Sequence, residues 1–124
     1  MELTIKDKIY KFKFGIGFVR YMDGKSSINQ NGVQFGVGLE TLVPKLMSRD
    51  TVALSDSLYI ANRTENPRIT ADAVDDFIDD ENTDVENLFE QVIEELKKSN
   101  ATRLKVKDLL KDIEEQAKAL KKKK

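Results

Sequence analysis

Two pairs of glycines are the residues of this chain whose spacing comes nearest to a ligand-binding motif. Gly15-x-Gly17 and Gly36-x-Gly38 each begin like the glycine-rich turn that binds the phosphates of a dinucleotide. The third glycine of that motif is replaced by Arg20 and by Thr41, and neither pair leads into a strand–helix–strand unit. The glycines are therefore predicted to allow tight turns and close backbone packing.

A group of acidic residues suggests two other kinds of chemistry, calcium binding and general acid–base catalysis. Asp80-x-Asn82-x-Asp84 begins like a calcium loop, but Val85 replaces the glycine at the sixth position and Gln91 the bidentate glutamate at the twelfth. Nothing in the pattern places the acidic pairs in an apolar cleft, so water can relieve their repulsion. The chain has no histidine or cysteine, which excludes Ser–His and Cys–His nucleophiles and typical zinc sites. We expect no catalysis, no metal and no cofactor.

Length and composition bound the class of protein. The 124 residues are 40% hydrophobic and 35% charged, with a formal net charge of −1, which predicts one mainly helical domain with a modest core. No run is long and apolar enough to cross a membrane, and no signal peptide precedes the first predicted strand. We therefore expect a cytoplasmic protein.

Alternating aromatic and charged residues open the predicted fold. Leu3–Ile5 and Ile9–Phe14 are predicted as the strands of an antiparallel β-hairpin that turns at Lys6–Lys8. A lone hairpin is marginally stable in water, so its aromatic face must be covered by helices. The polar segment Lys25–Gly32 is predicted to be an exposed, mobile loop.

Apolar residues at helical spacing predict a mainly helical body of five to six helices. The fold class is therefore α+β, with the N-terminal antiparallel β-hairpin packed against this body. One domain is expected over residues 1–120, followed by a basic, disordered tail over 121–124. The predicted helices are Gly15–Asp23 with Phe18, Tyr21 and Met22 inward; a second within Val33–Ser48; a third capped by Asp50, with Val52 inward; a fourth capped by Thr70; a fifth opened by the capping box Thr83–Glu86; and a last one from about Ala101, with Leu104 inward.

Charge is segregated along the second half of the chain. Every charged side chain from Asp72 to Glu95 is acidic, whereas lysine and arginine dominate from Lys97 onward. Solvated helix faces would account for this pattern. So would an electrostatic surface for a lysine-rich partner, or head-to-tail contact between subunits. Specific nucleic-acid recognition is not favoured, because the basic end lacks interleaved aromatic residues.

Four blocks of sequence occur in the order that one protein family shows. The first is a Leu-Thr-Ile strand, a turn, an aromatic–lysine strand and a Phe-Gly-x-x-Phe-x-Arg helix, which here spans Leu3–Arg20. The others are Gly36–Glu40 leading to Pro44, Leu58–Asn62 followed by Thr64–Pro67, and the acidic helix around Asp75–Ile78. In these blocks the chain resembles the tail assembly chaperones of long-tailed phages and prophages of Gram-positive bacteria.

The resemblance implies a binding function without catalysis. Such a chaperone coats the long helical tape measure protein before the tail tube forms, shields its apolar stripes from aggregation and helps recruit major tail tube subunits. The resemblance also implies self-association, since many copies would line one partner, and a protein of the host cytoplasm that is absent from the mature virion. The alternatives are a structural head or tail completion protein of the virion and a small nucleic-acid-binding regulator.

The contact surface for the partner is predicted from pattern alone. The apolar stripe of the fifth helix continues toward the next helix and, where exposed, would accept another amphipathic helix in a helix-in-groove contact. The predicted contacts are Leu88, Val92, Ile93 and Leu96, with an acidic rim of Asp75, Asp76, Asp79 and Asp80.

Overall fold

The N-terminal hairpin forms where the aromatic alternation predicts it, with a shorter second strand. In the computed structural model, which describes residues 1–122, β1 (Glu2–Ile5) pairs antiparallel with β2 (Lys8–Lys11). The two turn residues, Lys6 and Asp7, have φ angles of 51° and 65°. Positive φ at both positions is the feature of a two-residue turn whose twist matches that of the strands.

The chain beyond β2 stays extended and joins the hairpin to the helical body. Phe12 and Phe14 are buried, although they lie outside the strand. The amide of Phe12 donates to the carbonyl of Met1, and the amide of Lys13 donates to the carbonyl of Ala61, each at 2.8 Å. The aromatic residues that alternate along this segment therefore cover the core, as the pattern predicts.

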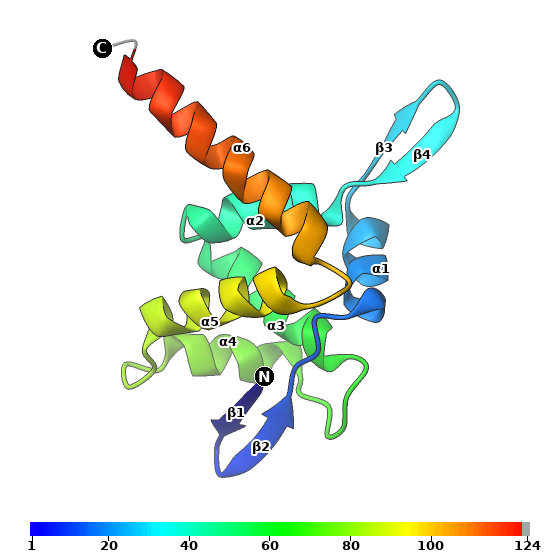
Figure 1. The fold of residues 1–124 in the computed structure, drawn as a ribbon. Coiled ribbons are helices and arrows are strands. Elements are labelled where there is room, and N and C mark those ends of the chain that lie inside the picture. The colour runs from blue at the N-terminus through cyan, green and yellow to red at the C-terminus, as the bar shows by residue number, and fades with distance from the viewer. Residues whose placement is uncertain (123–124) are drawn as a thin grey trace.

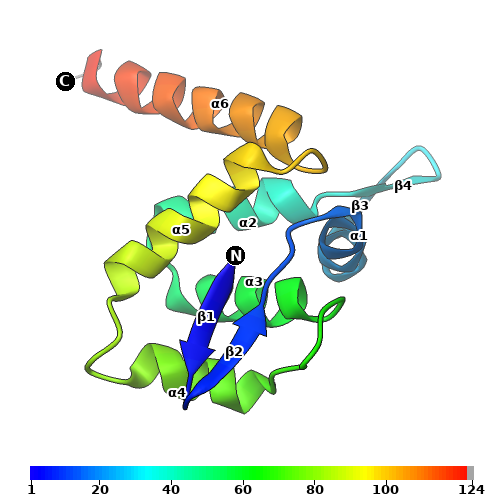
Figure 2. The same ribbon diagram turned by 60° about the horizontal axis from the view of Figure 1, so that its bottom comes forward.

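The helices and a second hairpin complete an α+β fold, which confirms the predicted class. The elements after β2 are α1 (Ile16–Lys25), β3 (Ser27–Gln30), β4 (Val33–Gly36), α2 (Gly38–Met47), α3 (Thr51–Asn62), α4 (Ala71–Asp79), α5 (Val85–Lys98) and α6 (Arg103–Lys122). Figures 1 and 2 show α2, α3 and α5 in the middle of the body, with α4 on one side and α6 on the other. The β3–β4 hairpin and the end of α6 project away from it.

Local hydrogen bonds begin three of the helices. Asp50 accepts from the amide of Ala53 and Thr70 from the amide of Ala73, so both predicted N-caps are confirmed. The predicted capping box is wrong by one residue: Asp84, not Thr83, caps α5. The hydroxyl of Thr83 donates instead to the carbonyl of Phe77, 2.6 Å away, at the end of α4.

The core is built from the inward faces of these helices. Leu39, Leu42, Val43 and Leu46 of α2 are all buried, as are Leu54, Leu58 and Ala61 of α3. The prediction fails at Val52 and at Leu104, whose side chains are 69% and 74% exposed. Both residues lie in the first turn of their helices, where helical spacing alone does not establish which face a neighbouring element covers.

The segment predicted to be a loop is a β-hairpin. Residues of Lys25–Gly32 form the end of α1, β3 and the turn into β4. The second helix, predicted within Val33–Ser48, occupies Gly38–Met47. The turn residues Asn31 and Gly32 have φ angles of 53° and 80°. This conformation is readily adopted by Asn-Gly, and it brings the two strands together in register.

Gly36 and Gly38 pack directly against α1. A Cβ atom on Gly38 would lie 2.6 Å from the backbone carbonyl carbon of Met22, and the amide of Gly38 donates to Asp23 at 2.9 Å. A Cβ on Gly36 would lie 2.3 Å from the side chain of Asp23. These glycines therefore allow the close approach that the sequence predicts.

The last helix extends through the start of the predicted basic tail. The structure describes α6 as far as Lys122, so Lys121 and Lys122 are helical. The other two residues of that predicted tail, 123 and 124, lie outside the described residues.

Candidate protein-binding surfaces

The predicted apolar contact residues lie mostly in the core. Leu88, Val92 and Leu96 are buried, and Ile93 is half-buried. In this conformation they hold α5 against the body, so a partner would reach the first three only if α5 moved. Their role as partner contacts stays a prediction that requires such an opening.

The predicted acidic rim is accessible on α4 and at its end. Asp75, Asp76, Asp79 and Asp80 are all exposed. Asp75 accepts a hydrogen bond from the hydroxyl of Ser55, which joins α4 to α3, and Asp80 accepts from the amide of Asn82 at 2.9 Å. These carboxylates do not surround an open apolar stripe on α5, because that stripe faces inward.

The β3–β4 hairpin carries an apolar face whose large side chains are about half exposed. Ile28 pairs with Phe35 across the strands, and Val33 lies two residues before Phe35, so all three side chains share one face. They are 45–53% exposed. The opposite face is polar, where Gln34 donates to the hydroxyl of Ser27 at 2.9 Å.

α6 presents a second apolar stripe. Val106, Leu110, Ile113, Ala117 and Leu120 follow one another at helical spacing. Val106 is buried and the next two are half-buried where α6 packs on α2 and α5. Ala117 is exposed and Leu120 is 68% exposed, on the part of the helix that Figures 1 and 2 show projecting from the body.

One ion pair fixes the start of α6 on α2. The ammonium of Lys105 lies 3.4 Å from one carboxylate oxygen of Glu40. The other oxygen of Glu40 is buried and has no hydrogen-bond partner among residues 1–122. An unpaired buried oxygen is costly, so the desolvation of Glu40 offsets part of what this ion pair contributes to the α2–α6 contact.

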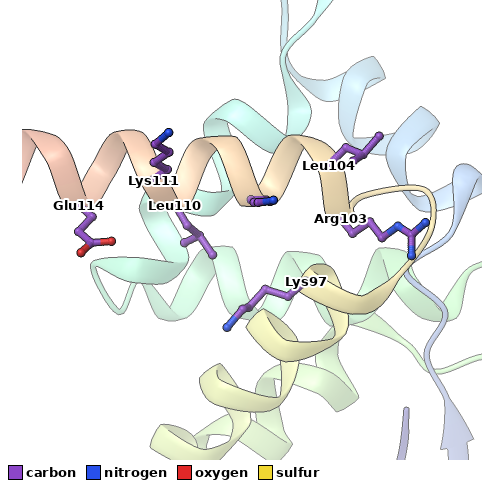
Figure 3. Close-up of a pocket in the computed structure, with 7 residues that line it drawn as sticks. Lys97, Arg103, Leu104, Leu110, Lys111 and Glu114 are labelled. Carbon is purple, nitrogen blue, oxygen red and sulfur yellow. The ribbon is translucent and has the colours of Figure 1, made fainter.

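A basic groove lies between α6 and the last turn of α5 (Figure 3). Its volume is about 640 Å³, and four cationic side chains line it with one carboxylate. We call this the basic groove; its charged residues are Lys97, Arg103, Lys107, Lys111 and Glu114, and its apolar ones are Leu104 and Leu110. Among residues 1–122, Arg103, Lys107 and Lys111 form no ion pair, whereas Lys97 lies 3.2 Å from Glu94.

Arg63 ties α1 to α3 on another side of the molecule. Its guanidinium donates to the hydroxyls of Tyr21 and Tyr59 at 3.1 and 3.0 Å, and lies 5.5 and 5.6 Å from their ring centroids. The hydrogen bond with Tyr21, more than any other contact, raises the pKa of Arg63 above its usual value. The prediction that Tyr21 faces inward is therefore wrong: it is exposed and is held at the surface by a cation.

The surfaces above are suited to binding, and the described residues contain no arrangement of side chains for metal chemistry. No group of three or more acidic residues within 1–122 is placed to hold a metal ion. None of the helices in the same residues combines the length and apolar character that a membrane crossing requires.

Comparison with known proteins identifies the family. The family model described as "Phage tail assembly chaperone protein, TAC" matches residues 2–111. The chain belongs to the phage tail assembly chaperone family. Searches of curated proteins and of solved structures each gave no match.

Membership sets the general class of function. A tail assembly chaperone acts on protein partners in tail assembly, and a chaperone family is typically non-catalytic. The predicted family is thus confirmed, and the predicted contact residues remain to be tested. A signal for the β3–β4 surface was present in the sequence, since Asn31-Gly32 between alternating apolar residues is a strong hairpin signal.

Proposed function

We propose that this chaperone binds the tape measure protein during tail morphogenesis and helps recruit major tail tube subunits. It would act in the host cytoplasm by binding alone, without a cofactor or catalysis, and would be absent from the mature virion. Several copies would line one long client, so self-association is part of the proposal.

Two projecting apolar faces carry this proposal. The face of the β3–β4 hairpin and the free end of the α6 stripe are exposed, and both stand away from the body. Monomeric proteins rarely expose large contiguous apolar patches, and such patches commonly mark binding sites. An amphipathic client helix would bury its apolar side against such a face, as in helix-in-groove recognition.

The direct test is co-expression with the tape measure protein encoded by the same phage or prophage. We expect the chaperone to increase the soluble fraction of the tape measure protein and to elute with it from a sizing column. Leu120→Lys and Ala117→Lys on α6 should reduce co-elution, because a charge on the stripe must be desolvated on binding. Glu115→Lys on the same helix is the matched control, since that exposed residue lies outside the stripe.

Unchanged solubility and no shared peak would refute the proposed function. Mass spectrometry of purified virions tests the alternative of a structural completion protein. A chaperone should be absent or strongly depleted, whereas a completion protein would be retained in a fixed number of copies.

A further inference from the structure

An acidic groove on the α4 side of the molecule matches the basic groove on the α6 side. It lies between the start of α3 and α4 and has a volume of about 280 Å³. Asp56, Asp75 and Asp79 line it beside the apolar side chains of Val52 and Ile78, and no cationic side chain of residues 1–122 does. We call this the acidic groove.

Each groove combines an exposed apolar side chain with charges, most of which form no ion pair within residues 1–122. Val52 lies in the acidic groove, and Leu104 lies in the basic groove. Within residues 1–122, Asp75 and Asp79 form no ion pair, and Asp56 lies 3.6 Å from Lys25. The apolar residues would be stabilised by burial, and the neighbouring charges would select a partner of opposite charge.

The two grooves of one molecule are kept apart. In both ribbon views α5 and α3 lie between α4 and α6. The acidic groove is built on α3 and α4, and the basic groove on α6 and the end of α5. One molecule therefore cannot pair its own acidic groove with its own basic groove, and a complementary charged surface for either groove would come from another molecule.

We propose that the basic groove of one copy binds the acidic groove of a second copy. Leu104 would pack against Val52 and Ile78, while Arg103, Lys107 and Lys111 would face Asp75 and Asp79. The two surfaces differ, so the contact is heterologous and its repetition gives an open chain or a ring. This inference rests on the self-association included in the proposed function and specifies its surfaces.

A second copy fits the basic groove better than a nucleic acid does. The groove holds Leu104 and Leu110 and no aromatic side chain on which a base could stack. The carboxylates of the acidic groove on this same chain carry the opposite charge, and they also lie beside an exposed apolar residue, Val52.

Charge reversal tests the contact in the purified full-length protein. The basic-groove variant is Lys107→Glu/Lys111→Glu, and the acidic-groove variant is Asp75→Lys/Asp79→Lys. Sedimentation velocity up to about 0.5 mM would measure self-association, since small interfaces are weak. We expect wild type to associate and each variant to raise the dissociation constant at least about tenfold, because like charges then face each other.

Mixing the two variants gives the decisive result. The intact acidic groove of the first variant then meets the intact basic groove of the second, so association should return in the mixture. Salt at about 1 M should weaken wild-type association, since the screening length falls from about 8 Å to about 3 Å. The matched controls are Asp72→Lys/Glu81→Lys and Lys6→Glu/Lys8→Glu, whose exposed residues line neither groove.

Several results would overturn the proposal. The first three are a wild-type protein that stays monomeric at every concentration, control variants that weaken self-association as much as the groove variants do, and a mixture of the two groove variants that stays monomeric. The fourth is that Lys107→Glu/Lys111→Glu mainly abolishes retention of duplex DNA. Circular dichroism would confirm that each variant is folded. Co-elution with the tape measure protein, measured separately, would show whether client binding survives when self-association does not.

Discussion

Asn62 is a buried polar residue that joins three segments of the fold. Its side-chain amide donates to the carbonyls of Lys11 and Pro67 at 2.9 and 3.1 Å, and its oxygen accepts from the amide of Ile69 at 2.7 Å. One side chain thus fixes β2 and the segment before α4 on the end of α3. Burial is favourable here because these polar atoms are paired.

Asn62→Ala should therefore destabilise the protein by about 2–4 kcal/mol, because the substitution leaves the amide of Ile69 and two carbonyls without partners. Urea unfolding monitored by circular dichroism measures this change. Asn82→Ala is the control, since Asn82 is exposed and its bond to Asp80 uses only its backbone amide. A free energy of unfolding within about 0.5 kcal/mol of wild type would contradict the role assigned to Asn62.

Gly38→Ala should destabilise the fold by about 1–3 kcal/mol, because the new methyl group would overlap the backbone of Met22 and Asp23. The shift of the thermal unfolding midpoint measures this change in stability. Gly24→Ala provides a control of opposite sign: a Cβ there meets nothing within 4 Å, and the residue lies within α1. Alanine should stabilise that helix by about 0.5–1 kcal/mol. Equal changes in stability at Gly38 and Gly24 would mean that close packing at Gly38 does not cause the destabilisation.

At the scale of elements, the β3–β4 hairpin is the clearest candidate for a surface kept for binding rather than stability. Ile28→Thr/Phe35→Thr should change the free energy of unfolding by less than about 0.5 kcal/mol, since both side chains are about half exposed. The same variant should reduce co-elution with the tape measure protein. Asn29→Thr/Gln34→Thr places the same residue type on the opposite face and should leave co-elution unchanged. A large loss of stability in the first variant would show instead that the apolar face supports the fold.

The elements that could be predicted from sequence are those whose own residues determine them. The first hairpin, the caps at Asp50 and Thr70 and the inward face of α2 follow from alternation, capping chemistry and helical spacing. The polar composition of Lys25–Gly32 predicts a loop, because composition alone does not take into account the turn signal at Asn31-Gly32 between alternating apolar residues. Helical spacing predicts the apolar stripe at Leu88, yet spacing alone does not establish whether it faces the core or a partner. In the structure α5 packs on α2, α3 and α6, and this stripe is buried.

At the scale of the whole molecule, stability should fall from the centre toward the two projections. α3 contributes a nearly continuous set of buried residues, whereas the β3–β4 hairpin and α6 beyond Ile113 have exposed side chains. Amide hydrogen exchange follows local opening, so protection should be greatest in α3 and least in the projections. Exchange should be measured in dilute protein, because self-association at higher concentration would slow the exchange of amides in part of α6.

Binding of the tape measure protein should change this order of amide protection. On addition of the tape measure protein, amides of the β3–β4 hairpin and of residues 114–122 should exchange more slowly, while those of α3 should keep their protection. Protection gained only in α5, near Leu88 and Val92, would point instead to an opening of the core that admits the client there. Strong protection of α6 in the dilute free protein would contradict a projecting helix. The pattern of amide protection therefore distinguishes client binding at the two preformed, projecting faces from client binding that requires the body to open.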